Sequence, residues 1–201
     1  MPDLEHRLRA ALAAPGGGSS DFDLNPAAAR PQGRTLRPAG VLVPVTLASG
    51  EARVILTKRS SRLKHHPGQI AFPGGKQDEG DASVAEAALR EAWEEIGLPR
   101  ELPRILGTLP DHETVTSFRV TPVVALIEQP FEMRPEPGEV EEVFEVPLPH
   151  LLEPGNFAVE SRIWQGTRRY YFTVPFGPYY IWGATARMLR GLAERMKAHA
   201  D

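Results

Sequence analysis

The chain has 201 residues, of which 41% are hydrophobic and 24% are charged, which is typical of a globular protein with one substantial core. Its formal net charge of −3 gives no general attraction to nucleic acid or to an anionic membrane, and we expect neither as a partner. The absence of cysteine excludes disulfides, thiolate metal sites and thiol nucleophiles, and fits a cytoplasmic location. We find no apolar run near the roughly 18 residues of a membrane span, and no signal peptide.

The N-terminal part differs in composition from the rest of the chain. Residues 3–13 have the leucine spacing of a short amphipathic helix, and residues 14–38 are rich in Pro, Gly, Ser and Ala. We therefore expect an N-terminal helix and extended arm over 1–38, followed by a single domain over 39–201. The oligomeric state is left open.

Beyond residue 39 the sequence alternates between strand and helix patterns. The expected strands are 41–47, 52–59, 70–72, 104–110, 119–127, 143–148, 160–165 and 169–174. The expected helices are 82–96, 148–153 and 181–198, with loops at 59–70 and 128–142. Strands surrounding two well-separated long helices predict an α/β fold, an α/β/α sandwich with a mixed β-sheet.

The helix at 82–96 carries the most informative side chains. At about 100° per residue, Glu91, Glu94 and Glu95 fall within one arc of its surface, opposite an apolar face. Like charges at these spacings each cost a few tenths of a kcal/mol, so the cluster indicates a neutralising cation. Oxygen ligands favour a hard divalent ion such as Mg²⁺ or Mn²⁺. Arg90, one turn from Glu94, is placed to hold the carboxylates in register.

The flanks of this helix have recognisable local signals. The glycine pair at 74–75 allows backbone to approach a ligand closely. Asp81 or Ser83 can cap the helix, and Glu86 completes a capping box with Ser83. Gly97 suits the left-handed residue that ends a helix.

Residues 74–98 resemble the signature of the Nudix hydrolases, Gly-x5-Glu-x7-Arg-Glu-apolar-x-Glu-Glu-x-Gly-apolar, which cleave nucleoside diphosphates linked to another moiety. The match is complete from Arg90 onward. Further upstream the signature has Gly and Glu where this chain has Lys76 and Ala82, and Asp81 is a shifted, shorter substitute for that Glu. The resemblance implies the Nudix-type α/β/α sandwich.

The segment just before the signature indicates which class of substrate is cleaved. Residues 55–75 are similar to the motif L-L-T-x-R-S-x3-R-x3-G-x3-F-P-G-G, which marks the coenzyme A pyrophosphatase branch of the Nudix hydrolases. Lys64 stands where the motif has Arg, which keeps the charge but loses the bidentate fork. The substrate-binding residues that we expect from this motif are Arg59, Lys64, Gly74 and Gly75.

The resemblance implies that water attacks one phosphorus of the diphosphate of coenzyme A and yields 3′,5′-ADP and 4′-phosphopantetheine. It implies that Glu91, Glu95 and Glu94 hold the metal and that Arg90 orients them. Several Nudix enzymes take their base from a distant loop, and here the acidic segment at 136–148 offers candidates. Glu139 is the preferred base and Glu142 the second.

Nine of the fifteen aromatic residues lie between Phe157 and Trp182. We expect most of them to be core residues of the late strands and the last helix, and one of them could instead stack on adenine. Two alternatives to the coenzyme A assignment stay open. One is a Nudix hydrolase of another nucleoside diphosphate derivative, and the other is a non-catalytic nucleotide-binding module.

Overall fold

A computed structural model of the chain describes residues 2–26, 33–63, 66–164 and 166–198. Its helices are α1 (Pro2–Ala13), α2 (Val84–Ile96), α3 (Leu148–Leu152), the 3-10 helix η1 (Pro154–Asn156) and α4 (Gly183–Ala198). Its strands are β1 (Ser19–Ser20), β2 (Arg37–Thr46), β3 (Arg53–Arg59), β4 (Ile70–Ala71), β5 (Gly74–Lys76), β6 (Arg104–Thr108), β7 (His112–Glu113), β8 (Phe118–Ile127), β9 (Val140–Pro147), β10 (Ala158–Trp164) and β11 (Thr167–Thr173).

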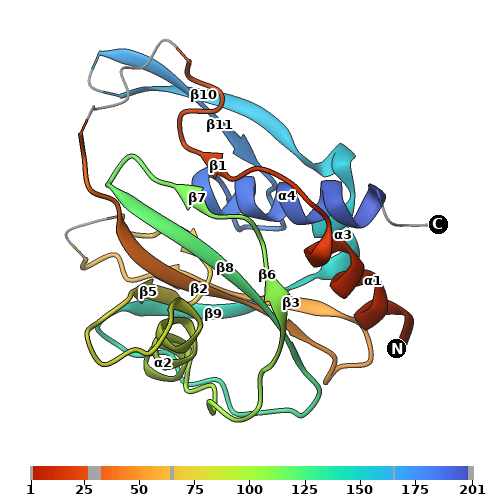
Figure 1. Cartoon of the computed structure of the whole chain (residues 1–201). Helices are drawn as coiled ribbons and strands as arrows, with labels where there is room; N and C mark the ends of the chain where they lie inside the picture. The colour runs from red at the N-terminus through yellow and green to blue at the C-terminus, as the bar shows by residue number, and fades with distance from the viewer. Residues whose placement is uncertain (1, 27–32, 64–65, 165, 199–201) are drawn as a thin grey trace.

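Two long parallel strands, β2 and β8, form the centre of the main sheet (Figure 1). On one side of this pair β2 is joined by β5 and β3, and β3 in turn pairs with β4 and β9, all antiparallel. On the other side, β8 is joined antiparallel by β6 and β7. The sheet is therefore mixed, as the sequence predicts.

Each central strand contains a proline in its interior, apart from Pro38 at the start of β2, and proline cannot donate to a β-ladder. Pro44 lies between the part of β2 that pairs with β5 and the part that pairs with β3. Pro122 lies between the residues of β8 that pair with β7 and those that pair with β6. Both prolines thus sit where one partner strand gives way to the next.

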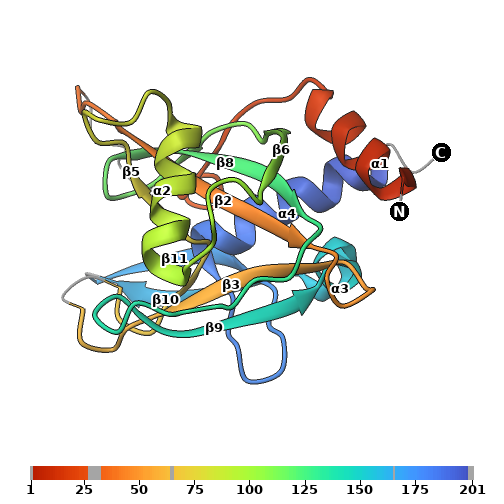
Figure 2. The ribbon, with the colours of Figure 1, turned by 90° about the horizontal axis from the view of Figure 1, so that it is seen from below.

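The side chains of the central strands alternate between two cores. Leu42, Val123 and Ala125 are buried beneath α2 together with that helix's apolar face. Their neighbours Val43 and Val124 point to the other core, which includes residues of α1, α3 and α4. Figure 2 shows α2 on one side of the sheet and α4 on the other. The α/β/α sandwich is confirmed.

The described part of the N-terminal segment lies against the rest of the chain. Leu8 of α1 is fully buried, and β1 pairs in parallel with β7. His112 of β7 is also fully buried, and its ring bonds Ser19 Oγ at 2.9 Å and Asp21 Oδ1 at 3.1 Å. The segment predicted as an extended arm thus contains β1 and the start of β2. The domain boundary at residue 38 stays a prediction.

The expectation that most of the aromatic residues between 157 and 182 are core residues is wrong. All nine lie in the described part of the chain, and Phe172 is the one that is buried. Trp164 is 41% exposed and Tyr170 is 45% exposed. For the rings on the hairpin the cause is topological, because β10 and β11 pair with each other and with no strand of the main sheet. Figure 1 shows this hairpin (blue, at the top) standing apart from the main sheet.

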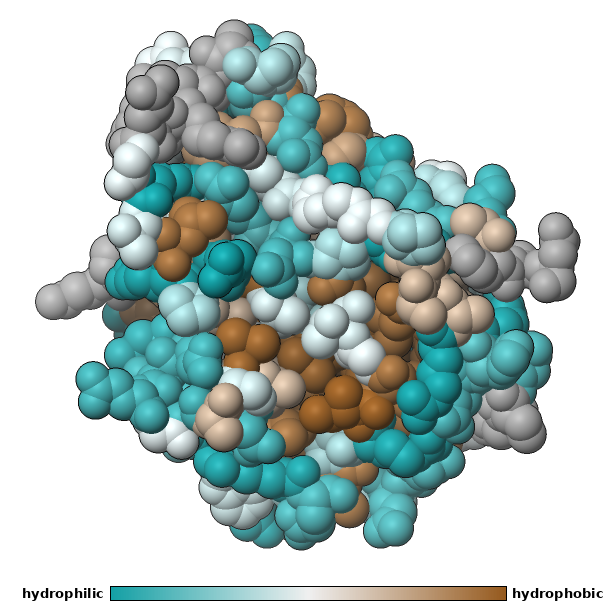
Figure 3. Space-filling view, viewed as in Figure 1, coloured by the Kyte–Doolittle hydropathy of each residue, from teal (hydrophilic) through white to brown (hydrophobic). Residues whose placement is uncertain are grey.

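The face of the molecule seen in Figure 3 is largely hydrophilic, with hydrophobic residues gathered near its middle, over β6 and β8. Ile105 of β6 is 39% exposed. In the described ranges, we find no helix with the length and apolar character that a membrane crossing requires.

Candidate functional site

Helix α2 begins and ends where its local signals predict. Ser83 is the N-cap, and its side chain accepts a hydrogen bond from the backbone N–H of Glu86 at 3.2 Å. Gly97 ends the helix with a φ of 71°, and its N–H donates to the carbonyl of Trp93 at 3.0 Å. The predicted alternative cap, Asp81, has a different role.

Asp81 forms the main ion pair of Arg90. The Arg90 Nε and Nη2 atoms donate to the two carboxylate oxygens of Asp81 at 3.0 and 2.9 Å, a bidentate arrangement. These bonds hold the pKa of Asp81 below its usual range, helped by the backbone N–H of Asp78. The Asp81 side chain is 7% exposed. The loop before α2 therefore accommodates the one-residue shift relative to the signature, and Asp81 still contacts Arg90.

Arg90 also holds two of the three helical glutamates. Its Nη1 atom donates to Glu91 Oε1 and to Glu94 Oε2, each at 3.0 Å. The combined anionic partners raise the pKa of Arg90, so it stays charged. The structure thus places Arg90 between the β5–α2 loop and the glutamates, and its role in orienting them stays a prediction.

Glu95 is the most deeply buried of the three glutamates, with 4% of its surface exposed. The backbone N–H of Gly74 donates to its Oε2 atom at 3.2 Å. Burial raises the pKa of Glu95 to about 8, and the negative charges of Glu91 and Glu139 add to that rise. A carboxylate in this environment gains strongly from a nearby cation.

Glu91 lies beside Gly75, and burial raises its pKa as well. A β-carbon added at Gly75 would collide with the Glu91 carboxylate. Gly74 is constrained differently, since its φ is 154° and an added β-carbon would lie 2.5 Å from the carbonyl oxygen of Gly40. The two glycines therefore let β5 pass between the central strand and the glutamates.

Gly40 itself is a residue that the sequence reasoning missed. A β-carbon there would overlap the carbonyl oxygen of Val84, so only glycine lets the first turn of α2 lie directly on β2. The available signal was a glycine at the start of an apolar strand pattern, which indicates close backbone approach.

Glu94 differs from the other two glutamates, because its side chain is 53% exposed and faces Arg90. Across residues 2–26, 33–63, 66–164 and 166–198, no three His, Cys, Asp or Glu side chains are already grouped as a metal site. Glu95 is buried and Glu91 is partly buried, and the negative charge of Glu91 raises the pKa of Glu95. Both supply oxygen donors, and the pKa of each is raised despite the nearby arginines, which fits a hard divalent cation.

Arg59, at the end of β3, lies near enough to Glu95 for its charge to act on that carboxyl. Its positive charge lowers the pKa of Glu95, opposing the effect of burial. Its Nε atom is buried and has no hydrogen-bond partner among the described residues. A buried guanidinium nitrogen without an acceptor is costly and indicates a missing anionic partner. The second predicted cation, Lys64, lies outside the described residues.

Glu139 is brought to the site by the pairing of β3 with β9. It precedes β9, and its carbonyl oxygen accepts from the backbone N–H of Ser60 at 2.8 Å. Its charge raises the pKa of both Glu91 and Glu95. The second candidate base, Glu142, instead accepts a hydrogen bond from the hydroxyl of Tyr179.

Comparison with known proteins agrees with this architecture. Residues 36–164 match the family described as the NUDIX domain. This chain belongs to the Nudix family. The chain is 42% identical to the Nudix hydrolase NudL of Citrobacter koseri over 168 residues, covering 82% of this chain and 87% of that protein. It is 41% identical to NudL of Cronobacter sakazakii, covering 78% and 81% of the two chains.

Solved structures support the Nudix fold. The NUDIX domain of Shewanella oneidensis NrtR, crystallised with ADP ribose, matches with a TM-score of 0.52 at 17% identity, covering 85% of this chain and 95% of that one. A MutT/nudix family protein from Enterococcus faecalis matches with a TM-score of 0.54 at 15% identity, covering 86% and 66%. At these identities the likeness shows the fold alone.

The two glycines of this Nudix site should respond differently to alanine. We expect Gly74→Ala to lower the free energy of unfolding by about 2 to 4 kcal/mol, because the new β-carbon meets main-chain atoms. Gly75→Ala meets only the movable carboxylate of Glu91, so stability should change by about 1 kcal/mol or less. Displacing that carboxylate should lower hydrolysis about a hundredfold. Urea unfolding and initial rates on both variants test this; equal losses of stability would contradict it.

Proposed function

We propose that this Nudix hydrolase cleaves the diphosphate of coenzyme A, or of its acylated or oxidised forms, to 3′,5′-ADP and the matching 4′-phosphopantetheine. The observation that carries the proposal is the buried, unpartnered Nε of Arg59 beside Glu95. Arg59 belongs to the segment that resembles the coenzyme A pyrophosphatase motif. Its position supports a diphosphate oxygen as the missing partner.

The proposed roles follow from the geometry. Glu91 and Glu95 would hold Mg²⁺ or Mn²⁺, with Glu94 as a further oxygen donor once it leaves Arg90. The cation, when bound, would neutralise charge on the diphosphate and lower the pKa of bound water. Arg90, anchored by Asp81, keeps the glutamate side chains in place.

Hydrolysis needs a proton acceptor for the attacking water. Glu139 is proposed for that role, because its charge acts on both Glu91 and Glu95 while its backbone is fixed next to β3. The water oxygen bonds to one phosphorus, the bridging P–O bond breaks, and the water proton passes to Glu139. Arg59 and Lys64 are proposed to hold the non-attacked phosphate oxygens, while Gly74 and Gly75 allow the diphosphate to approach the main chain.

Arg59→Met tests the substrate assignment. We expect KM for coenzyme A to rise about tenfold or more, because a charge-assisted contact with the diphosphate is lost. Arg53→Met is the matched control, since Arg53 lies on the same strand but pairs with Glu51 at 3.1 Å. Initial rates with coenzyme A and with ADP-ribose give the comparison. Unchanged turnover of coenzyme A in Arg59→Met, together with faster hydrolysis of ADP-ribose, would contradict the assignment.

A further inference from the structure

The hairpin formed by β10 and β11 covers a cavity of about 600 Å³. Its walls include the aromatic residues Trp164, Tyr171 and Trp182 and the cations Arg162 and Arg169. The volume is in the range of pockets that hold small organic ligands. Apolar rings with a few charged groups are the usual lining of such a site, so the cavity is a candidate for a ligand that is both aromatic and anionic.

The two arginines face each other across the hairpin. Arg162 on β10 lies directly opposite Arg169 on β11. Like charges directly opposite each other destabilise an antiparallel pair. The described residues that line the cavity include one carboxylate, Asp21, and that carboxylate bonds the ring of His112 and the backbone N–H of Val115. Among the described residues, neither arginine forms an ion pair with a carboxylate within 4.0 Å.

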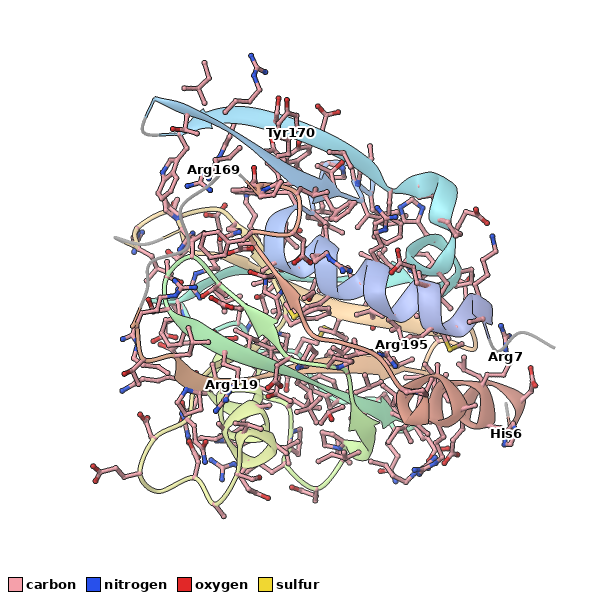
Figure 4. All side chains as sticks on the ribbon, turned by 45° about the horizontal axis from the view of Figure 1, so that its top comes forward. His6, Arg7, Arg119, Arg169, Tyr170 and Arg195 are labelled. Atoms are coloured by element: carbon pink, nitrogen blue, oxygen red, sulfur yellow. The ribbon has the colours of Figure 1, made fainter. Side chains whose placement is uncertain are left out.

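Of the two arginines, Arg169 has the stronger requirement for a hydrogen-bond acceptor. Its Nε and Nη1 atoms are buried, and neither has a hydrogen-bond acceptor among the described residues. Figure 4 places Arg169 on the side of the hairpin that faces the rest of the molecule. Both guanidinium groups lie near indole rings, Arg162 at 4.3 Å from the ring of Trp182 and Arg169 at 5.9 Å from that of Trp164. These contacts orient the cations without neutralising them.

The cavity adjoins the catalytic region through the loop that follows β3. Gly68 and Gln69 line the cavity. Their backbones are bonded to Arg59, because the Gly68 N–H donates to the Arg59 carbonyl at 3.0 Å and the Arg59 N–H donates to the Gln69 carbonyl at 2.9 Å. These bonds fix part of the cavity wall to the end of β3, where Arg59 lies.

We propose that this cavity binds the nucleoside end of the substrate, with its aromatic base against the tryptophan rings and a phosphate group, additional to the cleaved diphosphate, paired with Arg169 and Arg162. The inference rests on the proposed function, since it names the part of the substrate that this second site recognises. Arg162 and Arg169 are then specificity residues that act on binding and do not touch the reacting phosphorus.

Binding of 3′,5′-ADP and of adenosine 5′-monophosphate tests the cavity without catalysis. In a Trp93→Phe background, the remaining tryptophans are the two at the cavity, so tryptophan fluorescence reports on it directly. We expect 3′,5′-ADP to bind about tenfold or more tightly than the monophosphate. Arg169→Met and Arg162→Met should each remove most of that preference and leave the affinity for the monophosphate within about twofold.

Arg168→Met is the matched control. Arg168 precedes Arg169 on β11, does not line the cavity, and donates to Ser161 Oγ at 3.0 Å. The Arg168→Met variant should bind 3′,5′-ADP with the same affinity as the Trp93→Phe protein. Removing one member of the opposed arginine pair should not lower the melting temperature, whereas a purely structural role for Arg169 predicts a fall.

Kinetics separate this inference from the proposed function. With coenzyme A, Arg169→Met should raise KM about tenfold with kcat within about twofold, and KM for dephospho-coenzyme A should stay unchanged. If coenzyme A is hydrolysed but Arg169→Met behaves like Arg168→Met, the cavity assignment is wrong and the proposed function stands. If 3′,5′-ADP binds through Arg169 but coenzyme A is not cleaved, the proposed function is wrong and the cavity assignment stands.

Discussion

Glu95→Gln is expected to lower metal-dependent hydrolysis about a thousandfold, because it removes one of the two carboxylates proposed to hold the cation. Ligand binding in the absence of metal should remain, since the amide keeps an oxygen acceptor for the Gly74 N–H. Glu86→Gln, on the same helix but outside the site, is the matched control and should keep its rate within about twofold. An unchanged rate in Glu95→Gln would contradict the metal site. Loss of hydrolysis with retained nucleotide binding would exclude a purely binding module.

The same substitution should stabilise the metal-free protein at alkaline pH. The pKa of Glu95 is raised from 4.5 to about 8, so between these values the folded protein holds a proton that the unfolded chain has lost. The free energy of unfolding therefore falls as pH rises through this interval. Glu95→Gln removes that loss and should be more stable than the parent by about 1 to 3 kcal/mol at about pH 8.

Urea unfolding in EDTA measures this effect. Well below pH 4.5 the two proteins should have similar stability, because Glu95 is then protonated in both the folded and the unfolded state, and the gap should open as pH rises. Added Mg²⁺ should stabilise the parent more than the variant. If the variant is less stable than the parent at every pH, the prediction is wrong. The folded protein would then already supply enough positive charge to stabilise the ionised Glu95 carboxylate.

Glu139→Gln is expected to lower kcat by about a hundredfold to ten-thousandfold with little change in KM, since general bases contribute on that scale.

Two neighbouring glutamates serve as controls for this base. Glu141 pairs with Lys58 at 2.7 Å and Glu142 accepts from Tyr179, so Gln at either position should leave kcat within about tenfold. Full activity in Glu139→Gln combined with inactivity in Glu142→Gln would move the base to the second candidate.

Local signals account for the parts of the site that the sequence predicts well. The caps at Ser83 and Gly97 and the apolar face of α2 depend on residues within a few positions of each other, so the helix and its glutamates could be placed from periodicity alone. The bidentate contact between Asp81 and Arg90 could not, because it depends on how the loop before α2 folds back over nine residues.

Long-range pairing explains what the sequence left open or misjudged. Glu139 approaches the buried glutamates only because β9 pairs with β3, a contact between segments about 80 residues apart. The segment from Phe157 to Trp182 is rich in aromatic residues, as core segments often are. Composition does not reveal that β10 and β11 form a separate two-stranded sheet. Their rings are left to line a cavity, which no local pattern indicates.

Product analysis of the purified protein with coenzyme A, with Mg²⁺ and with EDTA, is the most direct measurement. We expect 3′,5′-ADP and 4′-phosphopantetheine in equal amounts with Mg²⁺ and neither product with EDTA. Faster cleavage of ADP-ribose or a dinucleoside polyphosphate than of coenzyme A, or release of the same products in EDTA, would contradict the proposed function.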